Sequence, residues 1–223
     1  MKVLILLLIG LLTCQALACQ ASAFGEAQGG SAEATTRLIE DFSQDPPGKF
    51  PIIFKTYPLQ RTKALKVYRV EGEGHHLHAD DVRQSGTVIF RHFPWRLDEW
   101  PILTWRWRAL ILPQGADFND TACSIYIVFG GYGGKSLKYL WSSTLPPETT
   151  VETREGRLFS RVVESGPSHS NQWRQVSVTI AEDFKLAFHT DEIPEPKGIG
   201  ILTDSDDTHS RSACDYDDFR LEK

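Results

Sequence analysis

The stretch from residue 101 to 131 constrains the fold most, because it holds the densest run of large side chains in the chain. Side chains in a β-strand alternate between two faces. Odd positions from 103 to 111 are apolar, whereas the even positions carry Arg106 and Arg108. Residues 121–129 alternate in the same way and are rich in aromatic and β-branched types, which suit a sheet. We therefore predict two strands joined as a hairpin, with an apolar face that needs a second sheet to cover it.

Short strands separated by Gly, Pro and Asp turns are predicted along the rest of the chain. Thr179 and Glu182 have the spacing of a capping box, and Phe184 and Phe188 lie four residues apart, so one short helix is predicted at 181–189. The pattern indicates an all-β fold, an antiparallel β-sandwich of the jelly-roll type. The further predicted strands are 38–42, 65–70, 75–79, 87–92, 137–142, 158–164, 173–180, 198–203 and 216–222.

The N-terminal residues 1–23 have the pattern of a signal peptide, with Lys2, an apolar run of ten residues and then small residues. Such a run is too short for a transmembrane helix, and no other stretch is long and apolar enough to cross a bilayer. Cleavage is expected either after Ala23 or before Cys19, which would then carry an N-terminal lipid anchor. We predict export to the bacterial periplasm or secretion, with a flexible leader at 24–36 and a single domain at 37–223.

The charge balance argues against nucleic acid as a partner. Without residues 1–23 the chain keeps 23 basic and 29 acidic side chains, a net charge of −6, and it has no contiguous basic block. Two cysteines remain, Cys123 and Cys214. They either pair in an oxidising compartment or serve as small buried apolar groups, and the sequence leaves both possibilities open.

An acidic run after the predicted strand 198–203 is the best candidate for a metal site. Asp204, Asp206 and Asp207 offer carboxylates at nearby loop positions, as calcium sites do. The run lacks the Gly and the distal Glu of an EF-hand loop. A solvated turn held by side-chain hydrogen bonds to the backbone is the alternative.

The histidine-rich run at 75–78 gives a second, weaker metal candidate. His76 and His78 would share one face of a strand, which is compatible with zinc. No further ligand stands at a spacing that closes the site, so a polar strand face is favoured.

Aromatic side chains beside arginines are the usual means of holding sugar rings. The chain has six tryptophans, and its candidate ligand-binding residues are Arg106, Arg108, Tyr139 and Trp141. The alternative is that the tryptophans form the core and the arginines pair with acidic residues of neighbouring strands.

Catalytic residues are not assigned. The sequence has no Gly-x-Ser-x-Gly elbow and no cysteine in a reactive context. Glu164, Glu182 and Asp183 are available for a carboxylate pair, but nothing in the sequence singles them out. A non-catalytic role is therefore favoured.

Several motifs together resemble the bacterial family called domain of unknown function 3047, over residues 37–222. The resemblance implies an exported bacterial protein and no particular activity. The motifs that carry it are Leu-Thr-Trp-Arg-Trp-Arg at 103–108, Ile-Tyr-Ile-Val-Phe at 125–129, Tyr-Leu-Trp at 139–141, Trp173, Glu-Asp-Phe at 182–184 and Ile-Gly-Ile-Leu-Thr-Asp-Ser-Asp-Asp-Thr at 199–208.

The first and last predicted strands are similar to those of galactose-binding-like and other carbohydrate-binding jelly rolls. The similarity lies in Ile-Glu-Asp-Phe at 39–42 and in residues 216–221. It implies a structural Ca²⁺ held by Asp41, Asp217 or Asp218.

The function predicted from the sequence is an exported, non-catalytic module that binds a carbohydrate or another envelope ligand on an aromatic and arginine face, with a structural calcium as an optional part. The alternatives are a hydrolase or lyase that acts on a polysaccharide, and a structural or interaction protein of the envelope.

Overall fold

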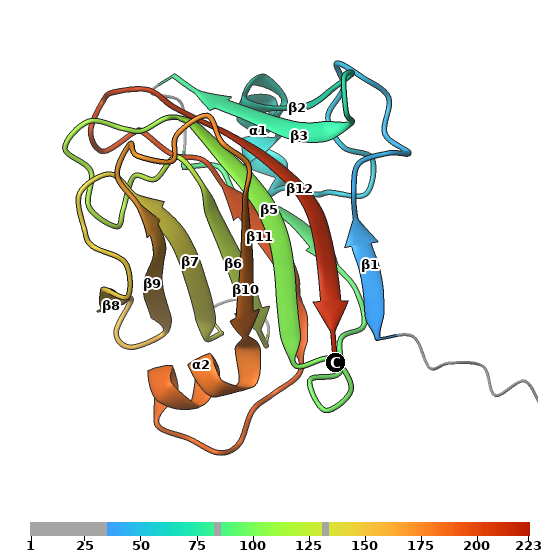
Figure 1. Ribbon diagram of the computed structural model, residues 1–223, viewed down its shortest axis with the longest axis vertical. Coiled ribbons are helices and arrows are strands. Elements are labelled where there is room, and N and C mark those ends of the chain that lie inside the picture. Colours follow the sequence, from blue (N-terminus) through green and yellow to red (C-terminus); the bar gives the residue numbers. More distant parts are fainter. Residues whose placement is uncertain (1–34, 83–85, 131–133) are drawn as a thin grey trace, which may run out of the picture. The chain divides into compact units, whose positions relative to one another are not determined.

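The computed structural model describes residues 35–82, 86–130 and 134–223. Residues 34–223 fall in one compact unit. The described residues of this unit form twelve strands in two six-stranded sheets, A and B (Figure 1). Sheet A contains β1 (Thr36–Glu40), β2 (Tyr68–Glu71), β3 (His76–Asp81), β5 (Ile102–Ile111), β10 (Arg174–Thr179) and β12 (Ser212–Glu222). Sheet B contains β4 (Ile89–His92), β6 (Ser124–Phe129), β7 (Ser136–Ser142), β8 (Thr150–Thr153), β9 (Leu158–Ser165) and β11 (Pro196–Leu202).

The two sheets pack face to face around one apolar core, so the predicted all-β sandwich is confirmed. The strand order is β10-β5-β12-β3-β2 in sheet A, where β1 also pairs with β12, and β4-β11-β6-β7-β9-β8 in sheet B. Large rings close the space between the layers. Trp105 of β5 meets Tyr139 of β7 with 5.8 Å between ring centroids, and Trp107 meets Trp141 at 6.2 Å. All the strand pairs named in this order are antiparallel except β7 and β9, which are parallel.

The predicted hairpin of residues 101–131 is wrong, although both of its strands exist. β5 lies in sheet A between β10 and β12, whereas β6 lies in sheet B between β11 and β7. The alternation of apolar residues is satisfied because each strand turns its apolar face to the same core from an opposite side. The intervening segment 112–123 therefore passes from one sheet to the other.

The predicted short helix is confirmed as α2 (Ile180–Phe188), which covers one end of the sandwich (Figure 1). Phe184 is buried, and its ring centroid lies 4.7 Å from that of Phe188. Thr179 is the N-cap residue, but its side chain makes no capping hydrogen bond. The helix thus depends on apolar packing more than on the capping box that predicted it.

A second helix stands where the sequence predicted a strand at 65–70. The chain forms a 3₁₀ turn, η1 (Pro58–Gln60), then α1 (Arg61–Val67), and enters β2 only at Tyr68. Five of the seven residues of α1 are good helix formers, and its two buried residues, Ala64 and Val67, lie three apart on one helix face. The short edge strand β8 was not predicted either.

A disulfide joins Cys123, just before β6, to Cys214 of β12, with 5.5 Å between their Cα atoms. Of the two possibilities that the sequence left open for the cysteines, the structure contains the pair. Because β12 belongs to sheet A and β6 to sheet B, this bond ties the two layers together through the core.

The signal peptide at 1–23, the lipid anchor at Cys19 and most of the leader lie outside the described residues. None of the helices in the described part has the length and apolar character that crossing a bilayer requires.

Candidate functional site

Three pairs of polar residues, each spaced by two along its strand, meet on the outer face of sheet A. Strands β3, β12 and β5 are neighbours, and their register places His78 opposite Asp215 and Asp215 opposite Arg108. The same register places Asp217 opposite Arg106, and His76 precedes His78 by two residues. Because strand side chains alternate, all six groups point away from the core.

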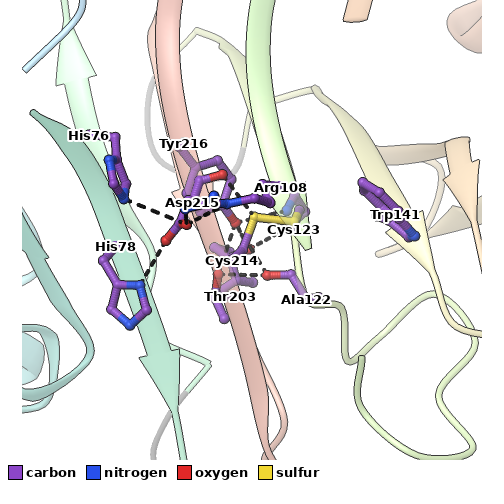
Figure 2. Close-up of a disulfide and its surroundings, with 12 residues drawn as sticks. His76, His78, Arg108, Ala122, Cys123, Trp141, Thr203, Cys214, Asp215 and Tyr216 are labelled. Carbon is purple, nitrogen blue, oxygen red and sulfur yellow. Dashed lines mark hydrogen bonds and ion pairs between the residues drawn. A yellow bond between two sulfur atoms is a disulfide. The ribbon is translucent and has the colours of Figure 1, made fainter. Parts of the chain in front are cut away.

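Asp215 is the centre of this arrangement (Figure 2). Its carboxylate accepts a hydrogen bond from Arg108 Nε at 2.9 Å and a second from Arg108 Nη2, and it lies 2.7 Å from His78 Nδ1. His76 Nε2 lies 3.5 Å away. Burial alone would raise the pKa of Asp215, but the hydrogen bonds from His78 and Arg108 and the nearby histidine charges outweigh it and hold that pKa below its ordinary value. The carboxylate is therefore ionised and fixed.

Arg106 lies beside this cluster and bridges two carboxylates. Its Nη2 donates to Asp217 at 2.9 Å, and its Nε lies 3.1 Å from Asp218. The ring of Trp173, just before β10, lies against both arginines, with 5.0 Å from its centroid to Cζ of Arg106 and 4.9 Å to Cζ of Arg108. Such cation–π contacts hold the guanidinium planes in place.

These groups line a pocket of about 540 Å³, a size usual for small-molecule sites. The carboxylates of Asp215 and Asp217 lie deep, with 1% and 10% of their side chains exposed, whereas Arg106 and Arg108 are 38% and 29% exposed. Glu71 and Glu73 also line the pocket, so a ligand would meet guanidinium donors and carboxylate acceptors beside an indole ring. The pocket is therefore suited to a ligand that presents hydroxyl groups, which both donate and accept hydrogen bonds.

The structure brings only half of the predicted ligand-binding residues to this pocket. Arg106 and Arg108 line it, and both pair with aspartates of a neighbouring strand, as the alternative prediction has it. Tyr139 and Trp141 are buried in the core against Trp105 and Trp107. The prediction that they form a ligand-binding patch with the two arginines is therefore wrong. Their strand β7 is buried on both faces, because the segment before β6 covers its outer side.

Sequence reasoning missed Asp215, Trp173 and the role of the histidines. One signal was present, since His76/His78, Arg106/Arg108 and Asp215/Asp217 are all spaced by two. The last strand was predicted to begin at 216, which left Asp215 outside it, whereas β12 begins at Ser212. The available carboxylates Asp183 and Glu164 are each held by a different arginine, Arg161 and Arg174, elsewhere in the fold.

The acidic run after β11 forms a separate cluster. Carboxylate oxygens of Asp120, Asp204 and Asp206 lie within 4.8 Å of one another. Asp120 accepts hydrogen bonds from the backbone N–H groups of Asp207 and Thr208. Asp207 therefore contacts the cluster through its backbone. Carboxylates in this number are compatible with Ca²⁺. Asp120 was not among the predicted ligands, because it precedes the run by more than eighty residues.

The other three predicted calcium ligands lie apart from that cluster. Asp41 accepts a hydrogen bond from the backbone of Ser43 at the end of β1. Asp217 and Asp218 are engaged by Arg106, and Asp218 also by Arg220. Arginine side chains thus occupy the positions around Asp217 and Asp218 that the likeness to carbohydrate-binding jelly rolls assigned to calcium.

A buried amine, that of Lys138, lies near the cluster of Asp120, Asp204 and Asp206. Lys138 of β7 donates from Nζ to the backbone carbonyls of Phe118 and Asn119, at 2.7 and 3.2 Å. Burial lowers the pKa of Lys138 to about 8, although the charges of Asp204 and Asp120 oppose the shift. The amine therefore supplies part of the positive charge that the aspartates face.

Asp204 makes the stability of the fold depend on pH. Burial raises the pKa of Asp204 to about 7, and the neighbouring carboxylates of Asp206 and Asp120 add to the rise. A raised pKa stabilises the fold at low pH, and that contribution is lost as the pH rises through about 7. We expect the free energy of unfolding to fall by about 2 kcal/mol between pH 5 and pH 8, and Asp204→Asn to remove most of this fall. Urea titrations at both pH values measure it.

If the cluster binds Ca²⁺, we expect the ion to counteract this loss of stability at high pH. A bound Ca²⁺ would favour the ionised carboxylates, so added Ca²⁺ would stabilise the fold at pH 8 and EDTA would reverse the gain. If stability at pH 8 is the same with Ca²⁺ and with EDTA, the calcium prediction fails.

Comparison with known proteins gives a family and distant structural likenesses. No curated protein sequence matches the chain. Among solved structures, the chain is similar to the xyloglucanase domain of NopAA, a type three effector from Sinorhizobium fredii, in complex with cellobiose. The two are 9% identical with a TM-score of 0.40, over 86% of this chain and 94% of that one. The model of the family described as Protein of unknown function (DUF3047) matches residues 54–220, within the range expected from the sequence motifs. The chain therefore belongs to the DUF3047 family.

Proposed function

We propose that the outer face of sheet A binds a saccharide, and that the protein is a non-catalytic binding module of the cell envelope or of the space outside it. The observation that carries the proposal is the pocket floor, in which the partly exposed Arg106 and Arg108 stand over buried aspartates beside Trp173. Sugar hydroxyls accept hydrogen bonds from such fixed guanidinium groups, and a sugar ring packs on an indole.

One tryptophan, Trp173, lines the pocket, and four of the other five are buried in the core. Trp95, Trp105, Trp107 and Trp141 have at most 1% of their surface exposed. A long row of exposed rings is thus not the basis of recognition, and we propose a short saccharide unit as the ligand. The disulfide supports an oxidising compartment and agrees with the proposed export.

We expect Trp173→Ala to weaken saccharide binding about tenfold, because it removes ring packing and frees both guanidinium groups. Arg106→Lys should also weaken it, since it keeps the charge but loses the planar fork of donors. Binding is first measured on immobilised neutral hexose and hexuronate oligosaccharides and then by calorimetry. Tyr57→Ala, an exposed aromatic on another edge, is the control. The proposal fails if no oligosaccharide binds or if the control behaves like Trp173→Ala.

A polysaccharide-cleaving enzyme is the second candidate, and one observation favours it. Asp215 and Asp217 lie on one face of β12, and their pKa values are shifted in opposite directions. Burial raises the pKa of Asp217, whereas that of Asp215 lies below its ordinary value. Divergent pKa values are typical of acid and base pairs. Release of new reducing ends or of unsaturated sugars from the neutral hexose and hexuronate oligosaccharides would favour the enzyme over the binding module.

A further inference from the structure

Residues 46–70 differ in charge from the rest of the chain. They contain six basic side chains and no acidic one, although the net charge of the whole chain is −5. The basic residues are two to six positions apart, so they form no contiguous block in the sequence. They are Lys49, Lys55, Arg61, Lys63, Lys66 and Arg69.

The fold places most of this stretch on one side of the sandwich. The Lys49 carbonyl accepts a hydrogen bond from Val70 of β2, at the edge of sheet A, and Lys55 pairs with Phe90 of β4, at the edge of sheet B. Further on, α1 packs against β2 and β3 and buries Ala64 and Val67. Residues 49–66, here called the edge segment, therefore span the two sheets. Pro51, Phe54 and Ala64 are buried, and most of the other side chains of the segment are exposed.

The edge segment also gathers exposed apolar side chains. Of the eight large apolar residues that are exposed in the described part of the chain, five lie in it, and Leu59 is 98% and Ile52 69% exposed. Leaving such side chains in water forgoes the free energy that their burial would provide. The five are Ile52, Ile53, Tyr57, Leu59 and Leu65.

The basic side chains of the edge segment are available to a partner. Within the described residues, no carboxylate lies within ion-pair distance of Lys49, Lys55, Arg61, Lys63 or Lys66. Elsewhere arginines such as Arg91, Arg106 and Arg161 pair with carboxylates. The positive charge of the edge segment is thus not neutralised inside the fold.

We propose that the edge segment docks on the surface of an anionic lipid bilayer. Exposed aliphatic side chains interleaved with lysines fit such an interface, because the apolar groups enter the acyl boundary while the ammonium groups stay at the headgroup phosphates. An acidic polymer would match the charge but would leave Leu59 and Ile52 in water. The bilayer matches both properties. The site is independent of the proposed saccharide pocket.

The test is co-sedimentation of residues 34–223, a compact unit with its own core, with vesicles. We expect binding to vesicles of phosphatidylcholine with phosphatidylglycerol, little binding to phosphatidylcholine alone, and weaker binding as salt rises. Lys63→Glu with Lys66→Glu should weaken binding at least thirtyfold, about the loss of two surface-bound cations. Ile52→Ser with Leu59→Ser, which keeps every charge, should weaken it at least tenfold.

Leu186→Ser is the matched control, because Leu186 is a similarly exposed aliphatic residue on α2, and it should bind like the unchanged chain. Absence of binding to the anionic vesicles overturns the proposal. So does binding that depends on the lysines alone and that heparin or DNA reproduces, since the partner is then a soluble polyanion. If Ile52→Ser with Leu59→Ser instead converts a dimer to a monomer in light scattering, a second copy of the chain covers the edge segment and the proposal fails.

Discussion

Replacing Cys123 and Cys214 together by alanine should lower the free energy of unfolding by about 5 kcal/mol. The bond closes a loop in which the two cysteines are 91 residues apart, and a loop of that length restricts the unfolded chain by about 4.5 kcal/mol in the chain-entropy description. Since both cysteines are fully buried, alanine also removes some packing. Equilibrium urea unfolding, with the slope checked for two-state behaviour, measures the loss.

A reductant supplies the control for this effect. It should lower the stability of the unchanged chain towards that of the double variant, whereas the double variant should not respond to it. The buried sulfurs are reached only when the chain opens, so reduction should be slow under native conditions. A double variant within 1 kcal/mol of the unchanged chain would show that the core and the sheets, rather than the bond, hold the two layers together.

The disulfide and the candidate pocket are linked through neighbouring residues of one strand. Cys214 turns into the core toward Cys123, and Asp215, the next residue, turns outward to meet Arg108 and the histidines (Figure 2). Loss of the bond should therefore loosen β12 at the point where the outer network is centred. Saccharide binding by the double variant is expected to weaken even under conditions in which it stays folded.

The sequence predicts the layers of this fold well, because strand alternation is a direct record of which side chains face the core. Trp105 and Trp107 were placed on an apolar face and Arg106 and Arg108 on the opposite one, and the burial of these residues agrees. Alternation does not record which strands pair. The alternation in residues 101–131 was therefore interpreted as a hairpin. In the structure, residues 112–123 instead carry the chain from one sheet to the other.

The site could be predicted only in part, because it depends on register across strands far apart in the chain. Arg108 and Asp215 are separated by 107 positions, and only the sheet order β3-β12-β5 makes them neighbours. The prediction that Tyr139 binds a ligand was wrong for another reason. Its strand is covered outside by the loop to which Lys138 donates, so the usual contrast between a wet and a dry face is absent there.

Asp215→Asn is expected to cost about 3 kcal/mol of stability, since it removes the carboxylate charge that a half-buried guanidinium group and two adjacent imidazoles face. The amide keeps the size of the carboxylate, so the loss reports charge rather than packing. A carboxyl group whose pKa is lowered in the folded state stabilises the fold above its ordinary pKa, and that contribution is lost as the pH falls through the lowered value. The difference between the unchanged chain and the variant should thus be fully developed at pH 5 and should shrink below about pH 4.

Asp217→Asn tests whether this cost belongs to the centre of the network or to any aspartate on the face. Asp217 is two residues further along β12, but burial raises its pKa despite the hydrogen bond from Arg106, so its charge adds little to stability. Its partner is more than one third exposed, and the expected cost is below about 1 kcal/mol. Urea unfolding of both variants decides the matter. Equal losses of stability in the two variants would mean that Asp215 is not the centre of the network. A loss in Asp215→Asn without the expected pH dependence would mean that hydrogen-bond geometry, not charge, holds the histidines and Arg108 together.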